Sequence, residues 1–206
     1  SLARRLLQAD RYGDAEKLLI RSLARWQGTS LSPETTGANE GLPQLLTSLA
    51  AIYSLKDQDD DVLLLVEKAS GWRKEDLASL LAVSFDDTPL GLIVAKSLAG
   101  TGQKDKAKEI LLAMIAERPG FDPPYELLLE VDPENALAIL ERAAIKDPYE
   151  ERPLIWKAKL LLGRGELAEA GKTIRQAILI DPSDGEQGKE RRMLAYSVLA
   201  DVIEQE

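Results

Sequence analysis

Apolar residues recur at intervals of three and four along most of the chain, which is the spacing of one face of a helix. One motif, with intervals of four, three and five residues and ending in proline, occurs in three places. Its copies are Ala107, Leu111, Met114 and Pro119; Ala136, Leu140, Ala143 and Pro148; and Ala170, Ile174, Ala177 and Pro182. The second and third copies are 34 residues apart. This pattern predicts an internal repeat built from helices.

The motif resembles the tetratricopeptide repeat, a helix-turn-helix unit of about 34 residues. In the 151–182 copy, Ala158 and Leu161 precede a turn glycine, Gly165, and the same types recur in the 88–119 copy. Small residues allow helices to approach closely, and large apolar residues fill the space beside them. The resemblance implies an all-α fold, a right-handed superhelical solenoid of antiparallel helix pairs.

We expect one domain over residues 1–206, with about five irregular repeats and a C-terminal capping helix. Four prolines, Pro43, Pro89, Pro124 and Pro153, fall where first helices would begin, a position that proline tolerates. The expected repeats are 1–27, 43–70, 88–119, 120–148 and 151–182, with a loop insertion at 28–42, an extra helix at 71–87 and a cap helix at 186–206.

Composition excludes several classes of site. The chain has 206 residues and neither His nor Cys, so it lacks the ligands of usual zinc sites, the bases of Ser-His-Asp and Cys-His catalysis, and disulfides. With 26 basic and 35 acidic residues, its net charge of −9 would repel nucleic acid. We expect no catalytic residue, no metal and no cofactor.

The sequence predicts no membrane span, because no apolar run approaches the ~20 residues that a spanning helix needs. The absence of cysteine fits both a cytoplasmic and an exported protein. Since the sequence begins at Ser1, we expect the native N-terminus to be missing. The compartment stays open.

Two motifs only approximate known ligand loops. Residues 165–173 approach a phosphate-binding loop but fail its glycine spacing, and the acidic residues 57–61 lack the glycine and glutamate of a calcium loop. We interpret both as parts of helix pairs. The tryptophans Trp26, Trp72 and Trp156 are expected to serve packing.

In the family that the sequence resembles, the first helices of the pairs line a concave groove that holds a segment of a partner protein. The groove positions here are Arg4, Leu92, Lys96, Arg152, Ile155, Lys159 and Leu162. Lysines at one repeat position in an acidic chain predict a basic strip for an acidic residue or a C-terminal carboxylate. The leucines and the isoleucine predict apolar anchors.

The leading functional hypothesis is a non-catalytic scaffold or adaptor that binds a protein or peptide segment. A structural spacer or dimerisation module within a larger protein or assembly is the alternative, and an enzyme is the less favoured rival because no residue pattern points to a reactive pocket. Homodimerisation, the partner and the pathway stay open.

Overall fold

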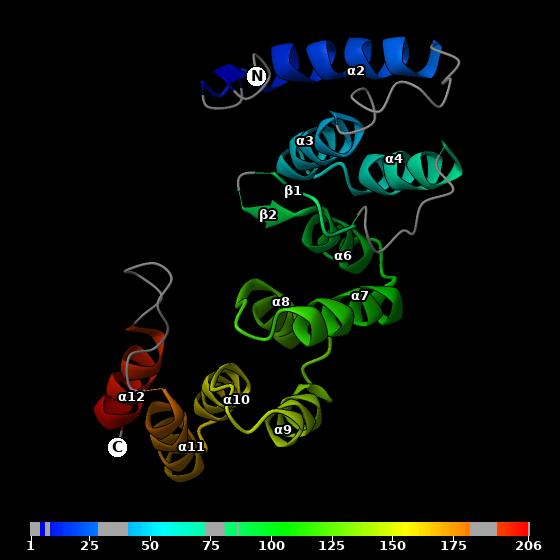
Figure 1. Cartoon of the computed structure of the whole chain (residues 1–206). Helices are drawn as coiled ribbons and strands as arrows, with labels where there is room; N and C mark the ends of the chain where they lie inside the picture. The colour runs from blue at the N-terminus through cyan, green and yellow to red at the C-terminus, as the bar shows by residue number, and fades with distance from the viewer. Residues whose placement is uncertain are drawn as a thin grey trace. The chain divides into compact units, whose positions relative to one another are not determined.

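The computed structural model describes residues 5–6, 9–28, 41–72, 81–85, 87–181 and 193–205. Its helices are α2 (Tyr12–Gly28), α3 (Gly41–Leu55), α4 (Asp59–Trp72), α6 (Leu90–Gly100), α7 (Lys104–Glu117), α8 (Pro123–Val131), α9 (Ala136–Lys146), α10 (Arg152–Gly163), α11 (Leu167–Ile180) and α12 (Leu194–Gln205) (Figure 1). Almost every described element is a helix, which confirms the predicted fold class. The chain divides into two compact units, residues 1–110 and 111–206, and α7 spans the boundary.

The N-terminal unit is a succession of packed helices. Helix α2 packs on α3, α3 on α4, and α6 contacts both α3 and α4. The small residues Ala15, Ala50 and Ala95 are fully buried, as the repeat pattern requires. Large residues from each helix complete the core: Leu19, Leu46, Leu49, Ile52, Val62, Leu90, Ile93 and Val94.

A short β-hairpin corrects the helix that we predicted over residues 71–87. Strand β1 (Ser84–Phe85) pairs antiparallel with β2 (Thr88–Pro89). Asp87 lies in the connecting turn with a φ of 65°, a left-handed conformation that aspartate tolerates better than most residues. Pro89 ends β2 and is the N-cap of α6, and the Leu90 amide donates to the Val83 carbonyl at 2.8 Å. The predicted helix is therefore wrong at its C-terminal end, and residues 73–80 lie outside the described part of the chain.

The C-terminal unit contains α8 to α12. Helices α9, α10, α11 and α12 pack in succession, and α10 also contacts α8 and α12. Ala170 and Ala177 have exposed fractions of 0%, which confirms the predicted close approach at these positions. One core cluster joins Ile155 and Ala158 of α10 to Ala195 and Val198 of α12. Helix α10 is therefore the centre of this unit.

Turn glycines separate the two helices of the best-matching repeats. Gly102 follows α6 with a φ of 79°, and Gly165 follows α10 with a φ of 75°. The amide of the next residue reaches back into the helix in both turns: Gln103 to the Leu98 carbonyl at 2.7 Å and Glu166 to the Leu161 carbonyl at 2.9 Å. Only glycine adopts this backbone conformation without strain.

Some predicted boundaries lie outside the described residues. Helices α2 and α3 end and begin at Gly28 and Gly41, and the loop residues 29–40 between them are not described. Helix α12 begins at Leu194, while residues 182–192 of the predicted cap segment are not described. The partition into five repeats within one domain stays a prediction. No helix in the described ranges is long and apolar enough to cross a membrane.

Candidate functional site

The predicted groove residues fall into two groups according to exposure. Lys96 is exposed on α6 and Leu92 is half-buried on the same helix, in the N-terminal unit. Lys159 and Leu162 are half-buried on α10, in the C-terminal unit. These four side chains reach the surface, each within its own unit. Arg4 lies outside the described residues.

The other two predicted groove residues are buried, which corrects their assignment as partner contacts. Ile155 has an exposed fraction of 0% because it packs in a cluster with Ala195 and Val198 of α12. Arg152 has an exposed fraction of 6%. Its guanidinium is enclosed by carboxylates, so in this conformation neither residue presents a side chain to a partner.

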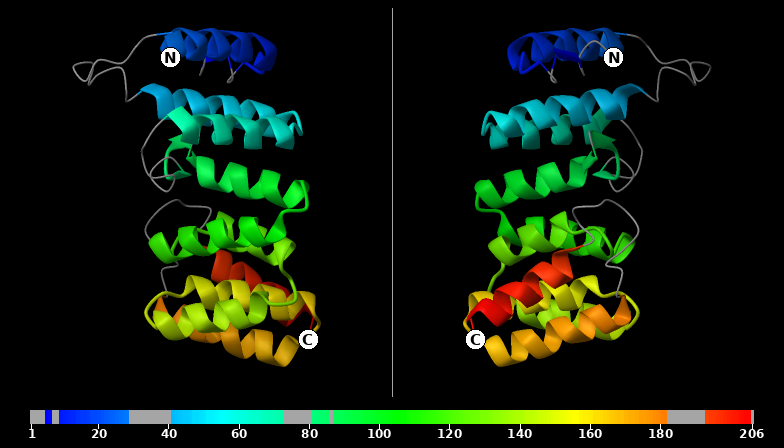
Figure 2. Two further views of the ribbon diagram at one scale, coloured as in Figure 1. Left: turned by 90° about the vertical axis from the view of Figure 1, so that its right-hand side faces the viewer. Right: turned by 90° about the vertical axis from the view of Figure 1, so that its left-hand side faces the viewer.

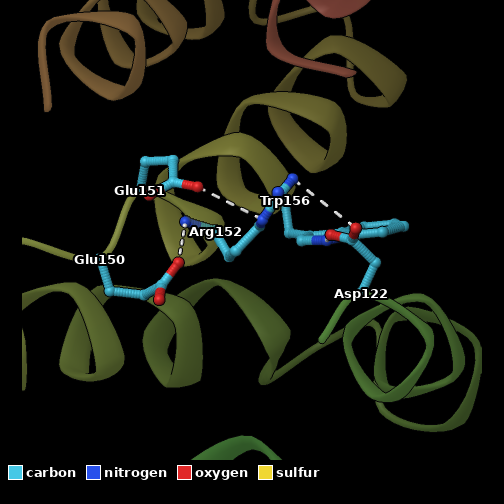
Figure 3. A network of polar contacts seen from close by, with 5 residues as sticks. All are labelled: Asp122, Glu150, Glu151, Arg152 and Trp156. Carbon is cyan, nitrogen blue, oxygen red and sulfur yellow. Dashed lines mark hydrogen bonds and ion pairs between the residues drawn. The ribbon is translucent and has the colours of Figure 1, made fainter. Parts of the chain in front are cut away.

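Arg152 is the centre of a buried polar network at the start of α10 (Figure 3). Its Nε lies 3.3 Å from Oε1 of Glu151, and its Nη1 lies 3.6 Å from Oδ2 of Asp122. The backbone amide of Arg152 donates to Oε1 of Glu150 at 3.1 Å. Asp122 directly precedes α8, so these ion pairs connect α10 to the beginning of α8. A guanidinium can satisfy several acceptors at once, which suits it to such a network.

Trp156 extends the network toward α8. Its Nε1 donates to Oδ1 of Asp122 at 2.9 Å, and both side chains are buried. Its ring is stacked on that of Tyr125, with the centroids 6.4 Å apart and the planes within 5°. The prediction that Trp156 serves packing is confirmed, because its exposed fraction is 3%.

Lys159 lies over the tryptophan, one helical turn along α10. Its Nζ is 4.3 Å from the centroid of the Trp156 ring. A cation above an indole face is attracted by the ring's electron-rich surface. Lys159 is only half-buried, so its ammonium group is held in place while it stays within reach of solvent.

Burial controls the titration of the carboxylates in this network. Burial raises the pKa of Glu151, and the attraction of Arg152 opposes the shift without reversing it. Burial likewise raises the pKa of Glu150. It also raises the pKa of the Tyr125 phenol, whose hydroxyl has no hydrogen-bond partner among the described residues. The network therefore has an energetic cost at neutral pH.

The polar groups of this site form ion pairs and hydrogen bonds that join two helices. In the part of the chain that the structure describes, no cluster of acidic side chains has the geometry of a metal site. The network joins α8 to α10, and Lys159 and Leu162 are the members of the predicted site that α10 leaves accessible. Sequence reasoning missed the roles of Asp122, Glu150 and Glu151. The adjacent acidic pair before Arg152 was the available signal.

Comparison with known proteins is informative for one part of the chain. Residues 127–190 match the family model described as tetratricopeptide repeat. This segment contains α9, α10 and α11, the helices on which the sequence pattern is clearest. No curated protein is similar enough in sequence to count as a match.

Solved structures show only loose likeness. YrrB, a tetratricopeptide repeat protein with an unusual peptide-binding site, is 14% identical with a TM-score of 0.49, over 95% of this chain and 87% of that chain. A MamA D159K mutant is 16% identical with a TM-score of 0.41, over 81% and 89%. The TPR2AB domain of yeast Sti1, in complex with pHSP90, is 15% identical with a TM-score of 0.39, over 98% and 83%.

The structure of residues 127–190 agrees with the family model that matches them. The helix pair α10 and α11 encloses Ala158, Ala170 and Ala177 and turns at Gly165, as the repeat requires. Members of this family are generally non-catalytic modules for protein–protein interaction. Residues 127–190 therefore carry the tetratricopeptide repeat, in sequence and in structure.

Proposed function

We propose that this protein is a non-catalytic scaffold that binds a segment of a partner protein along the first helices of its repeats. The observation that carries the proposal is the position of Lys159, whose ammonium group lies 4.3 Å above the buried Trp156 ring while the side chain stays half exposed. A lysine held in this way loses less side-chain freedom when it meets a carboxylate.

The buried network beneath Lys159 supports this role. Arg152 and Trp156 both contact Asp122, which fixes the first turns of α10 against the start of α8. A binding surface on rigid helices keeps its geometry without the cost of ordering a loop. Leu162, one turn further along α10, offers an apolar contact beside the charge.

The proposed partner segment carries an acidic side chain or a free C-terminal carboxylate for Lys159 and an apolar side chain for Leu162. In the N-terminal unit, Lys96 and Leu92 provide the same combination on α6. The charges would mainly steer and orient the segment, while the apolar contacts supply most of the affinity. The chain as a whole has a net charge of −9, so these lysines would be local sites of positive charge on an acidic protein.

The test is capture of partners from the native source by the immobilised chain of residues 1–206, followed by measurement of the affinity of each captured protein. Lys96→Glu combined with Lys159→Glu should weaken binding by ~10-fold or more, since each lysine would lose its attraction for a carboxylate of the partner and gain a repulsion. Rising salt should weaken the wild type in the same direction through screening.

A matched control carries the same change in net charge on second helices. Lys106 on α7 and Lys172 on α11 are exposed, and reversing both should leave the affinity near that of the wild type. Equal affinities for the wild type and the groove variant at low salt would contradict the proposed groove. Capture of no protein would favour the alternative, a spacer or dimerisation module.

A further inference from the structure

Helix α12 carries apolar residues on two sides. Ala195, Val198 and Val202 are buried against α10 and α11. A second set, spaced by three, four and three residues, lies on the exposed side and consists of Met193, directly before α12, with Tyr196, Ala200 and Ile203 of α12. We call this set the outer stripe. In the right-hand view of Figure 2, α12 lies in front of α10 and α11.

The exposure of the outer stripe is unusual for residues of this size. Met193 has an exposed fraction of 59%, Ile203 of 57% and Tyr196 of 37%. The stripe extends over about 15 Å of helix, at 1.5 Å per residue. Contiguous apolar surface of this kind marks an interaction site more often than scattered single residues do.

The outer stripe is complementary to itself when two copies run antiparallel. Met193 and Ile203 each lie five residues from Val198, and Tyr196 and Ala200 each lie two residues from it. An antiparallel pair centred at the level of Val198 therefore places Met193 opposite Ile203 and Tyr196 opposite Ala200. The large tyrosine faces the small alanine twice, which is the size match that close helix packing requires.

The charges of α12 favour the same orientation. Asp201 and Glu204 are exposed near its C-terminal end, and residues 194–205 contain no Lys or Arg. An antiparallel arrangement puts these carboxylates beside the N-terminal half of the other helix, where the peptide dipoles are positive. A parallel arrangement would instead bring the acidic ends together.

We propose that the outer stripe of α12 is a self-association surface, on which a second copy of the chain docks its own α12 antiparallel about a twofold axis at the level of Val198. The contact is isologous, so each residue pair forms twice. The contact does not involve the lysines of the proposed groove. One helix pair buries less than the ~1,200 Å² of a standard interface, so the dimer is weak and concentration-dependent.

Sedimentation equilibrium of the full chain tests the size match. The wild type should approach twice the monomer mass as its concentration rises. Ala200→Tyr places two tyrosines opposite each other, and Tyr196→Ala places two alanines, so each should raise the dimer dissociation constant by ~10-fold or more. The double variant Tyr196→Ala with Ala200→Tyr again places a tyrosine opposite an alanine. It should recover the dimer dissociation constant of the wild type. Ser197→Tyr, on the polar side of α12, should leave it unchanged.

Disulfide trapping tests the orientation separately, because the chain has no cysteine of its own. A mixture of Met193→Cys and Ile203→Cys chains should form the mixed disulfide faster than either chain forms its own. Faster bonding between two Met193→Cys chains would indicate a parallel pair and overturn the proposal. A monomer at every concentration, or a dimer that withstands Ala200→Tyr while the circular dichroism spectrum stays helical, would also overturn it.

Discussion

The indole Nε1 of Trp156 donates a 2.9 Å hydrogen bond to Oδ1 of Asp122, a residue 34 positions earlier in the chain. Both side chains are buried, and Oδ2 of the same carboxylate lies 3.6 Å from the Arg152 guanidinium. One aspartate therefore receives two groups from α10. This contact connects consecutive first helices in the C-terminal unit and supports the surface on which Lys159 lies.

Removal of the Asp122 carboxylate should be strongly destabilising. Asp122→Ala leaves the buried indole donor of Trp156 without its acceptor and removes one of the carboxylates around the buried Arg152 guanidinium, and it should cost about 3–5 kcal/mol of unfolding free energy. Asp122→Asn keeps an acceptor and should cost less, about 1–3 kcal/mol. Urea unfolding measures both. Asp105→Ala, where the side chain is 97% exposed, is the matched control. Equal midpoints for Asp122→Ala and the control would contradict the network's structural role.

Mild acid should stabilise the network. Burial raises the pKa of Glu150 and Glu151 above the ordinary value of 4.5, so the folded chain takes up protons before the unfolded chain does. The stability contributed by these groups therefore increases as pH falls through the folded pKa and is complete below the unfolded value. At neutral pH their charged forms are a cost.

The measurement compares the wild type with the double variant Glu150→Gln, Glu151→Gln, which cannot titrate at these positions. Amide hydrogen exchange is measured in α8 and α10 at pH 7 and at pH 5, and the rates are corrected for the intrinsic pH dependence of exchange. On going from pH 7 to pH 5, the wild type should gain protection relative to the variant. A relative loss of protection would reverse the sign and refute the assignment of burial as the dominant cause.

Close helix packing at Ala170 is also testable. Its side chain is fully buried in a cluster with Leu161 and Val202, so Ala170→Leu should overpack the core and cost about 1–3 kcal/mol. Ala168→Leu, on the exposed side of the same helix, should change stability by less than about 0.5 kcal/mol. Similar midpoints for the two variants would place Ala170 outside the core.

Two glycines near the turn between α10 and α11 should respond differently to substitution by alanine. Gly165 has a φ of 75° and open space around it, so Gly165→Ala should cost about 1–2 kcal/mol through backbone strain alone. Gly163 also has open space but no left-handed φ, so Gly163→Ala should be neutral or stabilise the chain by about 0.4–1 kcal/mol. Thermal denaturation of both variants decides the matter, and equal effects would refute the strain argument.

Sequence periodicity predicted the features that depend on local spacing. The buried alanines at 158, 170 and 177, the turn at Gly165 and the first turns at Pro124 and Pro153 follow from a pattern that each helix pair carries by itself. The hairpin at residues 84–89 escaped prediction because strands of two residues are too short to show a period.

The burial of predicted groove residues depends on contacts between distant segments. Ile155 occupies a groove position of its own repeat, but α12 covers it, and the repeat pattern does not contain α12. Arg152 is held in the interior by its ion pair with Asp122, which lies 30 residues earlier, in the expected repeat 120–148. The position of a residue in the repeat predicts the helix face on which it lies. Segments that pack on that face from elsewhere in the chain determine whether the residue is exposed.

Site-specific photocrosslinking tests the central claim most directly. A photoreactive amino acid replaces Leu162 on α10 in one copy of the chain and Gln176, an exposed residue of α11, in another. Both chains are illuminated in an extract of the native source, and the crosslinked proteins are identified by mass spectrometry. The proposed function predicts that position 162 crosslinks a partner segment containing an acidic residue or a C-terminal carboxylate, and that Lys159→Glu abolishes this crosslink while position 176 gives none. Crosslinking from position 176 but not from position 162 would contradict binding along the first helices.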